Sequence, residues 1–176
     1  MIITVSGPAG SGKTTLASLL SGKLGCSLIS TGSIFRRIAS DRGMSVVELN
    51  IAAEEDEGID RELDRRVVAE AISLPCCVVE GRLSCHMMRL SNVSAFSVYL
   101  DAPAETRIER ISRRDGIDRQ KAAQETFRRE ESERRRYLKI YGIDISDLSC
   151  YSMVINSADL PPESIAEMVM ARVRKG

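Results

Sequence analysis

The stretch Gly7-Pro8-Ala9-Gly10-Ser11-Gly12-Lys13-Thr14 decides the fold. It matches the pattern GxxxxGK[ST] and lies between an apolar run at 2–6 and a helix-period stretch at 14–24, which is the context that this phosphate-binding loop (P-loop) requires. Glycines here let successive backbone N–H groups converge on phosphate oxygens, and the positive end of the following helix strengthens their field. The motif therefore predicts a loop that binds nucleotide phosphates.

The residue types in this loop assign its ligands, ATP and Mg²⁺. Lys13 should bridge the β- and γ-phosphates and act in catalysis, and the Thr14 hydroxyl should occupy one coordination position of Mg²⁺. Thr15 is a further candidate for a phosphate contact. The residues predicted to bind the nucleotide are Gly7, Pro8, Ala9, Gly10, Ser11, Gly12, Lys13, Thr14 and Thr15.

Around the loop, short β-branched runs alternate with longer charged stretches of helical period. The predicted strands cover residues 2–6, 27–30, 76–80, 95–100 and 153–156. The predicted helices cover residues 14–24, 60–73, 103–114, 119–141 and 162–174. This alternation is typical of a parallel sheet with crossover helices. We expect an α/β, three-layer P-loop NTPase fold with a five-stranded parallel sheet, helices on both faces and a helical lid.

Composition limits the organisation and the partners. A chain of 176 residues with 43% hydrophobic content suits one domain over residues 1–176. The formal net charge is zero, so neither nucleic acid nor a membrane is expected as a partner, and we expect a monomer in the cytoplasm. The five cysteines show no CxxC spacing, so we expect reduced thiols packed in the core.

The charges are nevertheless unevenly distributed. Nearly half of the basic residues fall between Arg107 and Lys139, and the turn signal Asp115-Gly116 interrupts this segment. We therefore predict a basic helical hairpin over about 109–141 that closes as a lid. Its candidate lid arginines are Arg110, Arg113 and Arg114.

Three groups of residues fall at the carboxyl ends of predicted strands or on the lid, where parallel sheets place ligand sites. Ser30 to Arg36 ends the second strand and opens a helix, whose N-terminus with Arg36 suits an acceptor phosphate. Glu80-Gly81-Arg82 follows the third strand; Glu80 could hold Mg²⁺ through a water, and Arg82 could reach a transferring phosphoryl group.

The third group lies on the basic segment. Arg129, Glu133 and Arg136 share one helix face at i,i+4 and i,i+7 spacing, with Arg128 beside them. Such a stripe can bind phosphates, or it can be a salt-bridged surface. The chain contains neither an NKxD-type guanine motif nor a DxxG switch, which favours a kinase that acts on a small molecule.

These motifs together resemble the nucleoside monophosphate kinases, and among them the short archaeal branch of the cytidylate kinases. The resemblance covers nearly the whole chain. It rests on the P-loop, on Ser30 to Arg36 as [DS]-[ST]-G-x-[IM]-[YF]-R, on Gly81-Arg82 after the third strand, and on Arg129 to Arg136 as R-[DE]-x-x-[DE]-x-x-R.

The resemblance implies ATP-dependent phosphorylation of CMP, and of dCMP as well, with an acceptor-binding region over about 31–73. Arg82, Arg129 and Arg136 join Lys13 as expected catalytic residues. The implied substrate-binding residues are Thr31, Arg36, Arg61, Arg82, Arg129, Glu133 and Arg136. Arg61 is the implied nucleobase contact. Bacterial members carry an additional insert and usually have Asp after the Gly-Arg pair, whereas Leu83 stands here, which leaves one cytosine contact unassigned.

Two alternatives stay open. A related P-loop kinase could act on AMP, dephospho-coenzyme A or shikimate, although Ser30-Thr31-Gly32 lacks the DxD that shikimate-type kinases place after the second strand. A nucleotide-gated assembly factor could share the fold, but it would have no need of the acceptor arginines. The single histidine, His86, is interpreted as structural because an ionised acceptor phosphate needs no general base.

Overall fold

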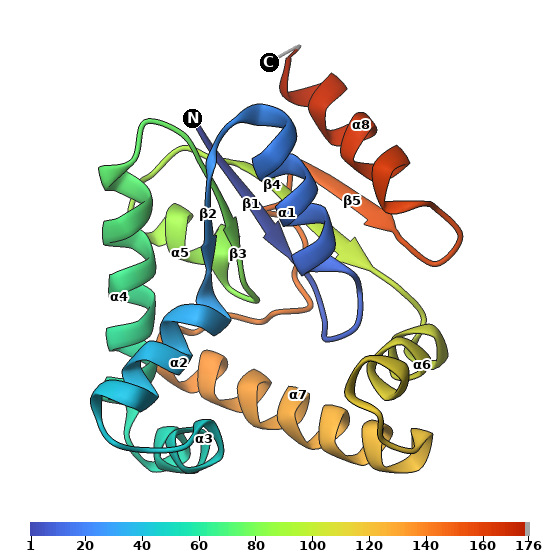
Figure 1. Cartoon of the computed structure of the whole chain (residues 1–176). Helices are drawn as coiled ribbons and strands as arrows, with labels where there is room; N and C mark the ends of the chain where they lie inside the picture. The colour runs from blue at the N-terminus through green and yellow to red at the C-terminus, as the bar shows by residue number, and fades with distance from the viewer. Residues whose placement is uncertain (175–176) are drawn as a thin grey trace.

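The computed structural model describes residues 1–174, and its centre is one parallel β-sheet. The strands are β1 (Ile2–Ser6), β2 (Ser27–Ser30), β3 (Cys77–Glu80), β4 (Phe96–Asp101) and β5 (Met153–Asn156). They lie in the order β2-β3-β1-β4-β5 and all pair in parallel (Figure 1). The predicted five-stranded parallel sheet is confirmed, although β3 begins one residue later than predicted and β4 is displaced by one residue toward the C-terminus.

Helices pack on both faces of the sheet and across one of its edges. They are α1 (Lys13–Leu24), α2 (Thr31–Asp41), α3 (Val46–Glu55), α4 (Glu57–Ser73), α5 (Ser84–Leu90), α6 (Ala104–Asp115), α7 (Arg119–Tyr141) and α8 (Pro162–Val173). The predicted α/β class with a helical hairpin is confirmed. Of the described helices, α3 and α5 were not predicted, and α4 begins three residues earlier than expected because Asp56 caps it by accepting from the N–H of Gly58.

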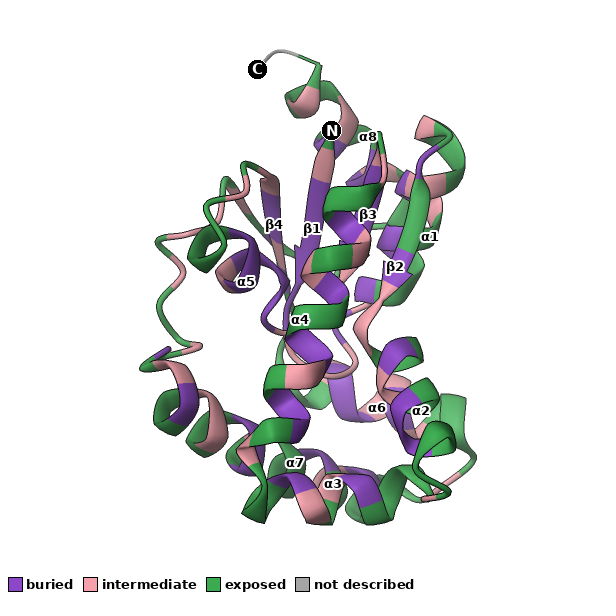
Figure 2. Ribbon diagram, turned by 90° about the vertical axis from the view of Figure 1, so that its left-hand side faces the viewer, coloured by how far each residue is buried: buried purple, intermediate pink, exposed green. Residues whose placement is uncertain are grey.

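Alternation along each strand divides the core between the two faces. Ile3, Val5 and Val78 pack with α1 and α8 on one face, whereas Cys77 and Val79 pack with α4 and α5 on the other. Figure 2 shows the buried residues concentrated along the sheet and on the helix sides that face it. The α6–α7 hairpin lies beyond the carboxyl ends of the strands (Figure 1). Burial of both faces thus leaves only the strand ends for a ligand.

The hairpin forms where its turn signal predicted. Gly116 ends α6 with φ 65°, a left-handed conformation that suits glycine, and Asp118 caps α7 by accepting from the N–H of Lys121. The two helices bury Ile108, Ile111 and Ala122 against each other.

The cysteine prediction was wrong for one pair. Cys26 and Cys76 form a disulfide, while Cys77, Cys85 and Cys150 are free thiols. The two bonded residues are 50 positions apart and precede β2 and β3, which start side by side at the amino edge of the sheet. Their proximity comes from strand pairing, so no short spacing in the sequence could reveal it.

None of the described helices is long and apolar enough to cross a lipid bilayer.

Candidate active site

The P-loop connects β1 to α1 and forms one wall of a cavity of about 760 Å³ at the carboxyl edge of the sheet. Gly10 has φ 77°, and a side chain there would meet the backbone carbonyl of Arg107, so only glycine fits. Gly12 caps α1 without a side-chain acceptor, and the first turn of the helix carries no acidic residue. The N–H groups of this turn are therefore available to an anion.

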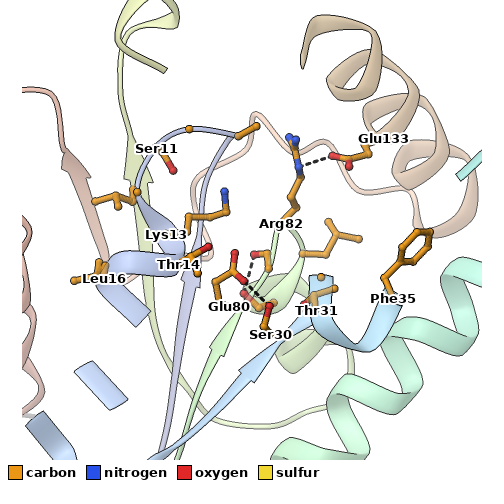
Figure 3. A pocket seen from close by; sticks show the side chains of 18 of the residues that line it. Ser11, Lys13, Thr14, Leu16, Ser30, Thr31, Phe35, Glu80, Arg82 and Glu133 are labelled. Atoms are coloured by element: carbon orange, nitrogen blue, oxygen red, sulfur yellow. Dashed lines mark hydrogen bonds and ion pairs between the residues drawn. The ribbon is translucent and has the colours of Figure 1, made fainter. Parts of the chain in front are cut away.

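Lys13 supplies a buried cation at the centre of this wall. Its ammonium donates to the Pro8 carbonyl at 2.7 Å, and its side chain extends into the cavity (Figure 3). Burial, followed by the charge of Arg82, lowers the pKa of Lys13 to about 8. A bound polyphosphate would raise this pKa again, because an anion nearby favours the ammonium.

Side chains that carry oxygen atoms lie beside the lysine (Figure 3). Glu80 ends β3 and accepts a hydrogen bond from the Ser30 hydroxyl at 3.0 Å, and the Thr14 hydroxyl lines the same part of the cavity (Figure 3). A hydroxyl and a single carboxylate are the kind of ligands that Mg²⁺ uses when substrate phosphates and waters complete its shell. The described residues contain no group of three or more His, Cys, Asp or Glu that could hold a metal alone. The donor set thus fits a metal brought in with a nucleotide.

Arg82 follows Gly81 directly after β3 and points into the cavity (Figure 3). The Thr31 hydroxyl occupies the space that a side chain on Gly81 would need, which brings the start of α2 against the end of β3. The Arg82 guanidinium forms an ion pair with Glu133 of α7 and approaches Glu130 at 3.6 Å. This cation is therefore held in place by carboxylates from α7.

The predicted arginine stripe on α7 does face the cavity. The Arg129 Nε donates to Glu133 at 2.7 Å, so Glu133, only 4% exposed, lies between Arg129 and Arg82. Arg136 pairs instead with Asp60 of α4, at 2.8 Å from Nε to Oδ2. The stripe forms ion pairs, as expected of a salt-bridged surface, but these pairs line a cavity, as expected of a phosphate-binding site. Both interpretations therefore apply in part.

Most predicted site residues gather around this one cavity. Those that line it are Ala9, Gly10, Ser11, Gly12, Lys13, Thr14, Thr15, Thr31, Arg36, Glu80, Arg82, Arg129, Glu133 and Arg136. Gly7 and Pro8 are not among the lining residues. Of the lid arginines, Arg110 and Arg114 line the cavity, whereas Arg113 pairs with Glu109 at 3.1 Å.

Arg61 is not brought to the cavity. Its guanidinium donates to the Ile140 carbonyl at 3.3 Å and lies 5.6 Å above the ring of Tyr141, at the end of α7. The helical period explains this, since residues 60, 63, 64 and 67 of α4 line the cavity and residue 61 points about 100° away from residue 60. A nucleobase contact for Arg61 therefore stays a prediction.

Arg107 and Glu130, to which the sequence analysis gave no role, fix the P-loop to the hairpin. Arg107 of α6 donates to the Ala9 carbonyl at 3.0 Å and to Glu130 at 2.8 Å, and Glu130 accepts from the Ala9 N–H at 3.3 Å. Arg110 donates to the hydroxyl and carbonyl of Ser157. From the sequence, an arginine near the start of a basic helix is expected to be exposed to solvent. Arg107 is only 8% exposed in the structure, and this burial reveals that it anchors the P-loop.

His86 lies outside the cavity lining. Its ring is 3.8 Å from the Cys150 Sγ and packs edge-on against Tyr151, and burial lowers the pKa of His86. These contacts agree with the structural interpretation of this histidine.

Known proteins resemble the chain in sequence and in fold. Residues 2–159 match the model of the cytidylate kinase-like family. A cytidylate kinase from Sulfurisphaera tokodaii is 42% identical over 171 residues, covering 97% of this chain and 94% of that protein. A cytidylate kinase from Methanobrevibacter smithii is 43% identical over 174 residues, covering 99% of each.

Solved structures share the fold at low identity. An uncharacterized protein from Eubacterium ventriosum superposes with a TM-score of 0.77 at 16% identity, covering 100% of this chain and 99% of that one. A shikimate kinase from Acinetobacter baumannii in complex with shikimate gives a TM-score of 0.65 at 20% identity, covering 99% of this chain and 93% of that one. These similarities establish a P-loop kinase fold and nothing about the substrate.

Proposed function

Because this chain belongs to the cytidylate kinase-like family, we infer that it transfers the terminal phosphoryl group of ATP to CMP. The observation that carries this inference is that the P-loop and the acceptor arginines, predicted separately, line one continuous cavity. An assembly factor with the same fold would not need a second cationic wall. A shikimate-type acceptor site is disfavoured because Ser30-Thr31-Gly32 replaces its acidic motif.

We assign the donor nucleotide to the P-loop wall. The N–H groups of residues 9–15 and the Lys13 ammonium would hold the β- and γ-phosphates, and the lysine would leave the Pro8 carbonyl to do so. Thr14 and Glu80 would hold Mg²⁺, Glu80 through a water, and the metal would neutralise charge on the transferred phosphoryl group. Ser30 orients Glu80 for this role through their hydrogen bond.

We assign the acceptor phosphate to the opposite wall. Arg36 of α2 lines this wall together with Thr31, and Arg129 and Arg136 reach it from α7, where Arg136 pairs with Asp60 of α4. In this state Arg129 and Arg82 are paired with Glu133, and Arg36 donates to the Ser33 hydroxyl at 2.8 Å. Phosphate oxygens would take over these donors, so acceptor binding exchanges a carboxylate for a phosphate at Arg82 and Arg129, and a hydroxyl for a phosphate at Arg36.

Transfer then needs alignment and charge, not a base. An ionised oxygen of the CMP phosphate forms the new bond to the γ-phosphorus, and the bond from that phosphorus to the β–γ bridging oxygen breaks, which leaves ADP and CDP. Lys13 and Arg82 both line the cavity and would stabilise the charge of the transferred group. Closure of the α6–α7 hairpin would exclude water that could otherwise hydrolyse ATP.

A coupled assay with ATP and Mg²⁺ against CMP, dCMP, UMP and AMP tests the proposal. We expect turnover with CMP and dCMP to exceed turnover with AMP by a wide margin. Preferred turnover of AMP would assign the protein to another acceptor, and ATP hydrolysis independent of all four acceptors would favour a nucleotide-gated binding protein.

A further inference from the structure

One wall of the cavity carries a buried carboxylate that the phosphate chemistry does not use. Asp60 and Asp64 are one helical turn apart on α4, 3% and 9% exposed, and both line the cavity. Asp60 has a partner of opposite charge, because Arg136 donates to both of its oxygens, at 2.8 and 3.5 Å. Among the described residues no lysine or arginine pairs with Asp64, whose Oδ2 accepts from the Tyr141 hydroxyl at 2.7 Å.

A buried carboxylate without a cation is costly, so it calls for an explanation. Burial, with a smaller contribution from the neighbouring charge of Asp60, raises the pKa of Asp64 to about 7, although the Tyr141 hydroxyl opposes the shift. No described residue donates to Oδ1. The structure thus keeps one polar oxygen on the cavity wall, fixed by a tyrosine and ready to accept a hydrogen bond from a ligand.

The surroundings of Asp64 suit a flat ring. Four apolar side chains line the cavity near this part of α4 and at the start of α5, beside the polar Asp60 and Ser84: Leu63, Val67, Leu83 and Met87. Leu83 and Met87 belong to one buried cluster against which Tyr137 and Tyr141 pack. An apolar slot with a single oriented acceptor is how proteins bind a nucleobase and choose between bases that differ at one edge.

We propose that Asp64, held by Tyr141, reads the base of the acceptor nucleotide and selects cytosine over uracil. This inference rests on the proposed function. Cytosine presents an amino group where uracil presents a carbonyl oxygen, so an accepting carboxylate pairs with the first and repels the second. Asp60 has a different role: it positions Arg136 toward the acceptor phosphate, which CMP and UMP share.

Asp64→Asn tests the assignment in the full-length protein. An amide can donate to the uracil oxygen, so we expect kcat/KM for CMP to fall about tenfold to hundredfold while kcat/KM for UMP falls less or rises, with an unchanged KM for ATP. Asp60→Asn is the matched control from the adjacent turn: it should lower kcat/KM for CMP and UMP in equal proportion. Glu62→Gln, on the outer side of α4, should change neither value.

The outcomes separate the inference from its premise. If the wild-type protein phosphorylates CMP and Asp64→Asn leaves the CMP to UMP ratio unchanged, the inference is wrong and the function stands. If the wild-type protein phosphorylates neither CMP nor dCMP, both fall. Should Asp64→Asn fail to fold, Tyr141→Phe is the second test, because it keeps the carboxylate but removes the hydroxyl that orients it. A reduced ratio of kcat/KM for CMP to kcat/KM for UMP supports the assignment, and an unchanged ratio overturns it.

Discussion

The two walls of the cavity are built in opposite ways. The donor wall consists of consecutive residues whose backbone N–H groups and one lysine face the ligand, and it needs little besides β1 and α1 to take its shape. The acceptor wall is assembled from side chains of α2, α4, α7 and the end of β3, and three of its cations, Arg82, Arg129 and Arg136, are already paired with carboxylates. The donor wall is thus general for nucleotides, whereas acceptor choice depends on contacts between distant elements.

This difference bears on how each wall responds to its ligand. Lys13 is bound only to a backbone carbonyl, so phosphate meets one neutral competitor. Arg82 and Arg129 both pair with Glu133, so an acceptor phosphate must displace a charged carboxylate from them. This competition makes the acceptor wall selective among acceptors. A ligand binds favourably only if its own contacts replace the ion pairs that the arginines lose.

The largest expected effect is on the donor wall. Lys13→Ala removes the P-loop cation that we expect to contact the transferred group and should lower kcat by orders of magnitude, with the fold intact by circular dichroism. A coupled assay at saturating ATP and CMP measures it. Turnover close to that of the wild type would show that the loop is not the catalytic wall.

On the acceptor wall, Arg36→Ala and Arg129→Ala should raise the KM for CMP about tenfold to hundredfold, since each charge-assisted hydrogen bond is worth roughly 1.5–3 kcal/mol. The KM for ATP should hardly change, because neither residue belongs to the P-loop. Arg174→Ala, an exposed arginine after α8, is the control. An equal loss of affinity for ATP and CMP would erase the distinction between the walls.

A smaller effect concerns the stability cost of the acceptor wall. The pKa of Asp64 rises from an ordinary value of 3.8 to about 7 in the folded protein. Between these values the folded state keeps a proton that the unfolded chain releases, so the free energy of unfolding decreases as pH rises through the window. Asp60 on the same helix adds to the shift, and Tyr141 from α7 opposes it.

Asp64→Asn removes this decrease. Thermal melts of both proteins below and above the window should show the variant gaining stability relative to the wild type as pH rises. A constant difference in melting temperature would mean that Asp64 is ionised without cost. Loss of acceptor selectivity together with gained stability above the window is the combination expected of a binding residue, not of a structural one.

The smallest expected effect is in the hairpin that joins the walls. Arg107 and Arg110 attach the first half of α6 to the P-loop and to Ser157, and Glu130 of α7 also contacts the loop, so we expect the hairpin between Arg110 and Glu130 to move most. Hydrogen exchange there should slow when a non-hydrolysable ATP analogue and CMP are both bound, while residues 104–110 stay protected throughout. Equal exchange with and without ligands would argue against a closing lid.

Prediction from sequence succeeded where the signal is local. The P-loop, the five strands and the turn at Asp115-Gly116 each depend on neighbouring residues, and each forms where it was predicted. Helix α3 was missed although its capping box, Ser45 with Glu48, is also a local signal that could have revealed it. Helix α5 is only seven residues long and carries no side-chain cap, so little in the sequence marks it.

By itself, then, the sequence determined a nucleotide-binding loop, a parallel sheet and a stripe of arginines, because backbone geometry and helical period are properties of short segments. Only the tertiary structure decided which partners those side chains meet. Arg136 pairs with Asp60, 76 positions away, and Cys26 bonds with Cys76, 50 positions away. The tertiary structure also places Asp64 on the cavity wall and Arg61 away from it. The packing of α4 against the sheet and α7 decides which face of this helix lines the cavity.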